Sequence, residues 1–275
     1  MRETFSVHEP EPSRETPLLV EVPHAGLDVP AELSGSLLAT ARSIARDADL
    51  YVDGLYQDAP TEGATLIVSH VSRYVVDLNR GEVDIDSESV VGGRPHPKAP
   101  RGLIWRLSTD AEPCLRAPLT GAELSARLDH VYRPYHARIV EILARKREKF
   151  GFAILLAAHS MPSAGRTAHG DAGNVRADVV PGTQGRTTAA AVVIDAVDAH
   201  ARLAKLSVKH DDPYRGGFAT RHYGTPREST HAVQVELARR LYMDETTLKR
   251  RPAEFDATRA WCRSLTRKLG ALALG

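Results

Sequence analysis

The sequence predicts a single α/β domain. Short apolar runs of strand length alternate along the chain with longer segments of helical periodicity, the order expected of strands connected by helices. The run from Phe152 to Ala158 is apolar at every position, which is typical of a central strand buried on both faces. No internal repeat and no long linker divides the 275 residues, so one domain accounts for nearly the whole chain.

The first half of the chain opens with an apolar run at 18–22, which we expect to be a buried strand. A helix-like stretch follows over 31–56, and two closely spaced β-rich runs, 65–69 and 74–78, are expected to be strands. The segment 81–101 contains two adjacent glycines and three prolines, a composition typical of loops. A loop of this length in a compact domain is more often a lid or a binding loop than a simple connector.

The second half repeats the alternation of strands and helices. The long stretch 121–149 has apolar side chains on one helical face. The elements expected after it are a strand at 152–158, an irregular stretch at 161–185, a helix at 187–204, a short strand at 206–209, a glycine-containing loop at 211–230, a last strand at 232–237 and an amphipathic helix at 253–272.

Residues 1–16 are rich in Glu, Pro, Arg and Ser and lack an apolar core. We therefore expect a flexible N-terminal segment over 1–16, a domain over 17–275 and no signal peptide. No apolar stretch is long enough to span a bilayer. The formal net charge of +1 provides no global field that would recruit nucleic acid. The cytoplasm is the expected location, and partners must be sought in local patches of the surface. These features leave open whether the protein forms a homo-oligomer.

The chain has two cysteines, Cys114 and Cys262. They lie far apart and belong to no CxxC or Cys/His finger pattern. This spacing argues against a disulfide scaffold and against a structural zinc site.

Two histidines occupy positions that favour a catalytic zinc site. His24 and His159 each follow an apolar run, and strand ends are where sites are assembled in α/β proteins. Zinc commonly takes three protein ligands and a water in catalytic sites, so an acid is expected as well. Asp49 is our choice, and the alternatives are Asp28, Asp47 and Asp53. A core or capping role is the alternative interpretation of either histidine taken alone.

The segment Asp77-Leu78-Asn79-Arg80 suggests a group that binds a carboxylate. An arginine guanidinium binds a carboxylate through two parallel hydrogen bonds, and a neighbouring Asn amide adds a donor with a fixed direction. Arg73 lies at the other end of the same run and is a candidate for a second carboxylate. The alternative is that these arginines form a salt bridge with Asp77.

The order of motifs along the chain resembles the N-formylglutamate amidohydrolase family. The resemblance covers almost the whole chain after the first sixteen residues. The matching segments are Pro23 to Gly26, Ser72 to Arg80, Tyr132 to His136, His159 to Met161, Pro213 to Gly217, Tyr223 to Pro226, Gln234 to Leu237 and Leu241 to Glu245.

The resemblance implies a fold similar to zinc carboxypeptidases and aspartoacylases, a mixed β-sheet with helices on both faces. It implies that His24, His159 and an acid hold Zn²⁺, that Asn79 and Arg80 bind the substrate carboxylate, and that Glu236 activates water. Other substrate contacts are expected from the glycine-containing loop and the arginines near it. These are Arg73, Arg215, Gly216 and Tyr223, with Arg221 as a further candidate for a side-chain carboxylate.

The expected activity is zinc-dependent hydrolysis of an N-acyl acidic amino acid such as N-formyl-L-glutamate, giving formate and glutamate, a step of histidine catabolism. One alternative is a metallo-deacylase or peptidase with another N-acyl substrate. Another is a family member that binds without turnover. Two departures from the family pattern keep these open: Ala157 and Ala158 precede His159 where family members usually place an acid, and 178–183 differs from the usual Leu-Gly-Asp pattern.

Overall fold

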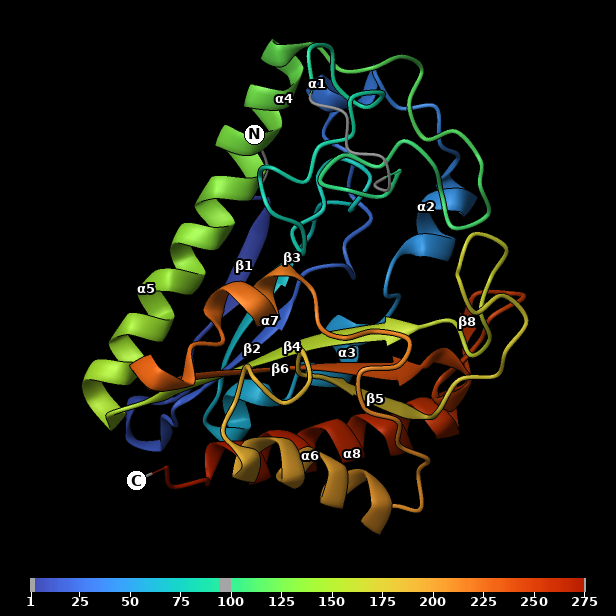
Figure 1. The fold of residues 1–275 in the computed structure, drawn as a ribbon. Helices are drawn as coiled ribbons and strands as arrows, with labels where there is room; N and C mark the ends of the chain where they lie inside the picture. Colours follow the sequence, from blue (N-terminus) through green and yellow to red (C-terminus); the bar gives the residue numbers. More distant parts are fainter. Residues whose placement is uncertain (1–2, 94–99, 275) are drawn as a thin grey trace.

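A six-stranded mixed β-sheet forms the centre of the molecule in the computed structural model, which describes residues 3–93 and 100–274 (Figure 1). The strand order is β1-β3-β2-β4-β6-β5. The four inner strands are parallel, and each edge strand runs antiparallel to its neighbour. The mixed α/β fold is therefore confirmed. The strands are β1 (Phe5–His8), β2 (Leu18–Val22), β3 (Thr65–Ser69), β4 (Ala153–Met161), β5 (Val179–Gly182) and β6 (Thr230–Ala238), with a separate pair, β7 (Met243–Asp244) and β8 (Lys249–Arg250).

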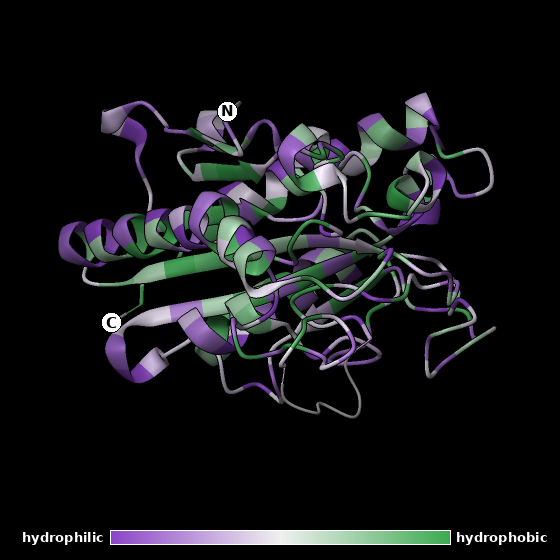
Figure 2. Ribbon diagram, turned by 90° about the horizontal axis from the view of Figure 1, so that it is seen from above, coloured by the Kyte–Doolittle hydropathy of each residue, from purple (hydrophilic) through white to green (hydrophobic). Residues whose placement is uncertain are grey.

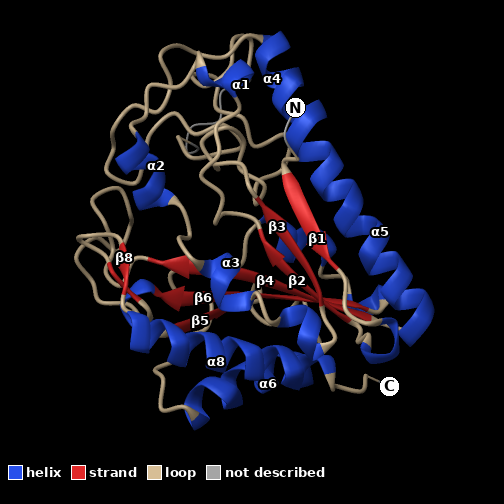
Figure 3. Ribbon diagram, turned by 180° about the vertical axis from the view of Figure 1, so that it is seen from behind, coloured by secondary structure: helices blue, strands red, loops and turns tan. Residues whose placement is uncertain are grey.

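Helices cover both faces of this sheet (Figures 1 and 3). One face carries the long helix α5 and the short helix α7. The other face carries α6 and α8, which lie side by side, together with α3. The helices are α1 (Ala31–Ser34), α2 (Ala41–Asp47), α3 (Val52–Tyr56), α4 (Gly121–Arg127), α5 (Arg133–Phe150), α6 (Ala191–Leu203), α7 (Phe218–Tyr223) and α8 (Pro252–Gly270).

The two faces of the sheet bury two separate hydrophobic clusters. Alternate residues of β4 point to opposite faces, so Leu155 packs in the cluster under α5 and Leu156 packs in the cluster over α6 and α8. In Figure 2 the strands are predominantly hydrophobic, whereas the helices alternate hydrophobic and hydrophilic residues along their length. This layering matches the prediction of a central strand buried on both sides.

The parallel arrangement of the inner strands places the candidate site. The carboxyl ends of β2, β4 and β6 meet at one edge of the sheet, and His159 of β4 is the register partner of Glu236 of β6. Alternate residues of a strand point to the same face of the sheet, so His159 shares a face with Leu155 of the cluster under α5, and Glu236 lies beside His159 on β6. The polar side chains at this edge therefore lie on the face that carries α5 and α7.

The helix expected over 31–56 is three short helices instead. Thr40 caps α2 by accepting a hydrogen bond from the Ser43 backbone N–H, so a new helix begins there. After α2 ends at Asp47, the backbone N–H of Asp49 donates to the carbonyl of His24 (2.9 Å). The chain leaves the helical path at this point because the segment is tied to the end of β2.

The prediction of strands at 74–78 and 206–209 was wrong. Residues 74–78 are buried, but their backbone forms turns, and the Asp77 N–H donates to the carbonyl of Leu103 in a loop (2.8 Å). Their apolar composition reflects burial and not strand pairing. Residues 206–209 contribute only a single bridge, between Val208 and Val179.

The helix expected over 121–149 is continuous except for one π-helical turn at Leu128–Tyr132, which joins α4 to α5. Pro134 lies in the first turn of α5 and has no backbone N–H. In a regular α-helix, the missing N–H of the proline would leave a carbonyl in the preceding turn without a donor. The π turn lies immediately before the proline and changes the hydrogen-bonding pattern there.

Other expectations concern the ends of the chain and the cysteines. Within the N-terminal segment, Phe5–His8 form β1, which pairs with β3 at the edge of the sheet. Cys114 and Cys262 are both free thiols, and both are buried. In the described ranges, no helix combines the length and the apolar character needed to cross a membrane. Of the loop expected over 81–101, residues 94–99 lie outside the described residues.

A first prediction concerns the core. Leu156 is fully buried, so Leu156→Ala should lower the free energy of unfolding by about 2–5 kcal/mol through lost burial and the cavity left behind. Leu203 is 83% exposed, and Leu203→Ala should change it by less than about 0.5 kcal/mol. Urea titration of both variants measures this difference. Equal effects of the two substitutions would contradict the buried position of β4.

Candidate metal centre and substrate cavity

Three side chains converge at the carboxyl edge of the sheet: His24, Asp49 and His159. All three are buried, and one ligand atom from each lies within 4.8 Å of the others. Asp49 Oδ2 is 3.6 Å from His24 Nδ1 and 3.0 Å from His159 Nδ1. The imidazole rings are tilted, with their centroids 4.9 Å apart. The structure therefore brings together the two histidines and the acid chosen from the sequence.

The local sequence explains how these side chains are positioned. His24 lies just beyond β2, where the chain turns away from the sheet. A Cβ on Gly26 would lie 2.3 Å from the backbone of His70, so only glycine allows this close approach. Asp49 follows α2 and is fixed to His24 through the backbone. His159 is part of β4 itself, which makes it the most rigidly held of the three.

The carboxylate of Asp77 holds His24 in place. Asp77 is fully buried and its Oδ1 is 2.8 Å from His24 Nε2. A carboxylate accepts hydrogen bonds, so His24 Nε2 donates to Asp77, and Nδ1 is the ring nitrogen on the side of Asp49. The same carboxylate also accepts from Arg73, from the Trp105 indole (2.9 Å) and from the backbone of Asn79 (2.8 Å).

The electrostatics of the two acids follow from these contacts. Burial alone would raise the pKa of Asp77, but the Arg73 guanidinium and His24 hold it well below its usual range. Burial would also raise the pKa of Asp49, and His159 and His24 lower it instead. Both carboxyl groups are therefore ionised, and the pocket between the two imidazoles carries negative charge.

This donor set fits a zinc ion. Two imidazole nitrogens and a carboxylate oxygen are ligands that zinc takes in catalytic sites. Within the described chain, His24 Nδ1 is buried and makes no hydrogen bond. This nitrogen lies 3.6 Å from Asp49 Oδ2, so a cation placed between the two atoms would have an imidazole nitrogen and a carboxylate oxygen as ligands. Asp77 supplies the partner on the outer ring nitrogen that metal-bound histidines have.

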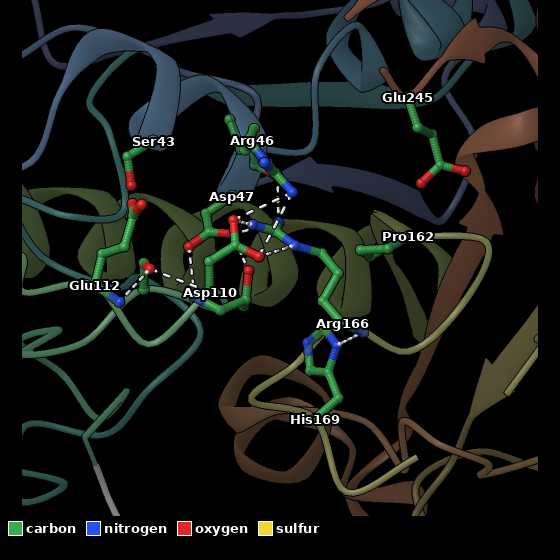
Figure 4. A network of polar contacts seen from close by, with 12 residues as sticks. Ser43, Arg46, Asp47, Asp110, Glu112, Pro162, Arg166, His169 and Glu245 are labelled. Carbon is green, nitrogen blue, oxygen red and sulfur yellow. Dashed lines mark hydrogen bonds and ion pairs between the residues drawn. The ribbon is translucent and has the colours of Figure 1, made fainter. Parts of the chain in front are cut away.

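The other acids considered as ligands lie elsewhere. Asp47 accepts hydrogen bonds from Tyr74 (2.6 Å), from Thr109 and from Arg166 (2.7 Å), so its oxygens are fully used. Arg166 extends between Asp47 and Asp110, joining α2 to two loops (Figure 4). Asp53 is exposed on α3, and Asp28 is exposed beside Val71. The structure places Asp49 alone of the four candidates between the histidines.

His159 is preceded by Ala157 and Ala158, where the family pattern usually has an acid. Ala157 shares a sheet face with His159, and its register partner on β2 is Glu21. Neither oxygen of the fully buried Glu21 carboxyl has a hydrogen-bond partner among the described residues. Burial raises the pKa of Glu21 to about 8, so this carboxyl is largely neutral at pH 7. His159 is instead held by Asp49 on one nitrogen and by the Asn79 amide (3.3 Å) on the other.

Glu236 lies beside the candidate ligands His24, Asp49 and His159, on the strand next to His159. It is 5% exposed, and burial raises its pKa to about 7. The amide of Gln234, two residues earlier on the same face of β6, donates to Glu236 Oε1 (2.8 Å). A carboxyl group with this pKa can both accept and return a proton near neutral pH.

Asn79 and Arg80 line a cavity of about 420 Å³ that also contains the three ligand side chains and Glu236. The Asn79 side chain packs against Gly217, where a Cβ would lie 2.2 Å from its amide nitrogen. The Ala219 N–H donates to Asn79 Oδ1 (3.0 Å), which fixes the orientation of the amide. Arg80 donates to the carbonyls of Arg101 and of Asn79, both at 3.1 Å.

Of the remaining residues predicted to contact substrate, some line the cavity and others do not. Arg215 and Gly216 line the cavity. Arg73 lines it as well but is paired with Asp77 (2.8 Å), so the salt-bridge interpretation applies to Arg73. Arg221 lines an adjoining hollow. Tyr223 does not line the cavity. Its hydroxyl lies 2.7 Å from His136 Nδ1, under α7, which gives no support for a substrate contact.

Sequence reasoning missed several residues of the cavity. Gln234 was detectable, because it alternates with Glu236 on one face of a strand. Arg101 and Trp105 come from the long loop after the Asp77 motif, where composition predicts irregular structure without indicating which side chains face inward. Arg239 reaches the centre from beyond β6 and donates to the carbonyl of Ala48 (2.6 Å).

Comparison with known proteins identifies related sequences. The family model for N-formylglutamate amidohydrolase matches residues 16–243. A protein of Pseudomonas putida named N-formylglutamate deformylase is 34% identical over 233 residues, which cover 84% of this chain and 83% of the relative. A protein of the same name from Pseudomonas aeruginosa is 34% identical over 263 residues, covering 92% of each chain.

Solved structures lead to the same family. A gene product of Agrobacterium tumefaciens has a TM-score of 0.71 at 21% identity and covers 97% of this chain and 94% of its own, which shows the fold alone. The crystal structure of N-formylglutamate amidohydrolase from Ralstonia eutropha JMP134 has a TM-score of 0.88 at 30% identity and covers 98% of this chain and 97% of its own. The chain belongs to the N-formylglutamate amidohydrolase family.

Proposed function

We propose that this protein is a zinc-dependent amidohydrolase that removes the formyl group from N-formyl-L-glutamate, giving formate and glutamate. The observation that carries the proposal is the buried cluster of His24, Asp49 and His159 with Glu236 on the neighbouring strand. The names of the Pseudomonas relatives support the choice of substrate. The likeness to zinc exopeptidases remains a prediction from the sequence.

His24, Asp49 and His159 would hold the zinc ion. When bound, zinc supplies a Lewis acid that polarises the formyl carbonyl and lowers the pKa of a water. Two features of the protein suit these residues to bind zinc: Asp49 is ionised, and the hydrogen bond to Asp77 fixes the His24 ring. The hydrogen bond from His24 to Asp77 also increases the basicity of the ligating nitrogen.

Glu236 is proposed as the general base. One of its oxygens is fixed by Gln234, which leaves the other to accept a proton from the attacking water. Glu236 then returns this proton to the nitrogen of the leaving glutamate, so formate and a free amine are produced without net proton uptake by the side chain. Its raised pKa, near 7, suits both halves of this transfer.

Asn79 and Arg80 are proposed to bind the α-carboxylate. The Asn79 amide lies 3.3 Å from His159, so this pair lies next to the three ligand side chains. In the described chain, neither side chain is paired with an acid of the protein, whereas Arg73 is paired with Asp77. A carboxylate held here would place the adjacent amide bond near Glu236, which is the positioning that a hydrolase requires.

The departure at 178–183 gives no reason to prefer another acyl donor. None of these residues lines the cavity, and the Asp178 carboxylate is bound by Ser207 (2.6 Å) and Arg240 (2.7 Å) on the outside of the sheet edge. Hydrolysis of a different N-acyl amino acid and binding without turnover are outcomes that the experiments below distinguish.

The second prediction tests the function itself. The purified protein should hold about one zinc per chain and release formate from N-formyl-L-glutamate, with slower release from N-acetyl-L-glutamate. Chelation should abolish formate release and zinc addition should restore it, because the buried cluster supplies every ligand. Metal analysis and a formate assay measure both quantities. Formate release that persists in a metal-free preparation would exclude zinc dependence.

The third prediction compares two neighbouring acids. Asp49→Asn, like His24→Ala or His159→Ala, should abolish stoichiometric zinc binding. Asp47→Asn is the matched control, because it should retain zinc while losing up to roughly 3–5 kcal/mol of stability with its Arg166 ion pair. Metal content and thermal unfolding separate the two effects. Zinc retained by Asp49→Asn and lost by Asp47→Asn would reverse the assignment of the acid ligand.

The fourth prediction concerns the base. Glu236→Gln should retain zinc and substrate affinity but lower kcat by roughly two to four orders of magnitude, the usual contribution of a positioned proton-transfer group. The substitution is nearly isosteric and leaves Gln234 with a hydrogen-bond partner. Single-turnover kinetics with metal analysis provides the measurement. A near-normal kcat would exclude Glu236 as the base, and loss of zinc would make it a ligand.

A further inference from the structure

The cavity is lined by an unusual number of guanidinium groups. Seven arginines contribute to its wall, from segments spread over most of the chain. They are Arg46, Arg73, Arg80, Arg101, Arg166, Arg215 and Arg239. The cavity therefore attracts anions. A ligand can use only those guanidinium groups that no acid of the protein already neutralises.

Four of the seven are neutralised by acids of the protein itself. Their ion pairs are Arg46 with Asp110 (3.2 Å), Arg73 with Asp77 (2.8 Å), Arg166 with Asp47 (2.7 Å) and Arg239 with Asp49 (3.5 Å). Across residues 3–93 and 100–274, no ion pair is formed by Arg80, Arg101 or Arg215. The intervening residues 94–99 contain no Asp or Glu.

Two of the three remaining arginines are held in fixed positions. Arg80 Nε donates to the carbonyl of Arg101 (3.1 Å), so its guanidinium lies against the Arg101 backbone. Arg101 Nη2 donates to the carbonyl of Ala168 (2.8 Å), which anchors its side chain to the loop on the opposite side of the cavity. Arg215 is exposed and its side chain makes no hydrogen bond among the described residues. Arg80 and Arg101 are therefore the preorganised pair.

Two neighbouring guanidinium groups without acid partners repel one another, and partial burial increases the cost. Burial lowers the pKa of Arg101, and the charges of Arg80 and Arg73 lower it further against the opposing effect of Asp47. An anion bound by both arginines, or one anion on each, removes this repulsion. A carboxylate matches the planar guanidinium through two parallel hydrogen bonds.

We propose that Arg101 binds the side-chain carboxylate of the substrate and so makes this cavity specific for N-acyl dicarboxylic amino acids. This inference rests on the proposed function, in which Asn79 and Arg80 hold the α-carboxylate beside the three ligand side chains. The α-carboxylate and the side-chain carboxylate of glutamate are separated by three carbon atoms. Arg101 lines the same cavity and is tied to Arg80 through its carbonyl, so it is the neighbouring cation that would meet the second group.

The assignment differs from the candidates that the sequence suggested. Arg73 is engaged by Asp77 and stacks over the Trp105 ring at 4.4 Å, so its charge serves the protein. Arg221 lines the adjoining hollow, and Arg215 lacks the fixed geometry that selects one ligand length. Arg101 alone of these combines a position on the cavity wall, an anchored side chain and an unneutralised charge.

The fifth prediction compares N-formyl-L-glutamate with N-formyl-L-glutamine, which have side chains of nearly the same shape, ending in a charged carboxylate in the first and a neutral amide in the second. Arg101→Met should reduce kcat/KM for the glutamate substrate by roughly ten- to a hundredfold, the loss expected of a charged hydrogen bond, and change kcat/KM for the glutamine substrate little. Arg101→Lys should fall between the wild type and Arg101→Met, because the charge remains without the planar geometry. Arg202→Met, on the exposed side of α6, is the matched control and should leave both values unchanged.

The ratio of the two kcat/KM values is unaffected by the fraction of each variant that folds. Equal losses for both substrates, with the ratio retained, would overturn the role of Arg101 while leaving the deformylase proposal standing. A ratio that collapses in Arg215→Gln but not in Arg101→Met would also overturn it. If the wild type releases formate from neither substrate, the proposed function fails. Calorimetry then decides on Arg101, since glutarate should bind the wild type at least tenfold more tightly than Arg101→Met, and equal binding would refute the assignment.

Discussion

The buried carboxylate of Asp77 is the interaction on which the site depends. It has no access to water and accepts five hydrogen bonds, from Arg73, Trp105, His24 and the Asn79 backbone. A buried charge left without partners would cost several kcal/mol, so these groups cannot move independently of it. One carboxylate thereby sets the direction of the His24 ring, the position of Asn79 and the pairing of Arg73. The proposed zinc ligand His24 and the proposed carboxylate-binding residue Asn79 therefore share a single anchor.

Asp49 and Glu236 show how environment assigns different roles to two buried carboxyl groups. Both are buried, and burial raises the pKa of each. Asp49 lies between two imidazoles, which more than offset the cost of burial and keep it ionised. Glu236 receives less compensation from His159 and is opposed by Asp49 itself, so its pKa is near 7. Two acids whose pKa values are separated in this way can divide the tasks of holding charge and transferring a proton, which are the roles proposed for Asp49 and Glu236.

The sequence was informative where one local feature decides the structure. The runs at 18–22 and 65–69 match β2 and β3 because a short, fully apolar segment between polar ends has few alternatives to a buried strand. His24, His159 and Glu236 were found for the same reason, since each ends such a segment or lies near its end. The run at 74–78 misled because burial there is provided by loops. Whether an arginine is paired depends on which acid the fold brings to it, and sequence spacing does not show this. The sequence therefore did not reveal that Arg73 is paired with Asp77 or that Arg101 is anchored to the carbonyl of Ala168.

The position of β6 has a consequence for synthesis of the chain. This strand is among the last elements to emerge, yet it lies inside the sheet, between β4 and β5. Until residue 238 has left the ribosome, one side of β4 has no strand to pair with, and that strand is almost wholly apolar. The unfinished chain therefore exposes an apolar, unpaired strand edge, a surface of the kind that promotes aggregation during synthesis. Glu236 arrives on the same strand, so no truncated chain ending before it can form the complete site.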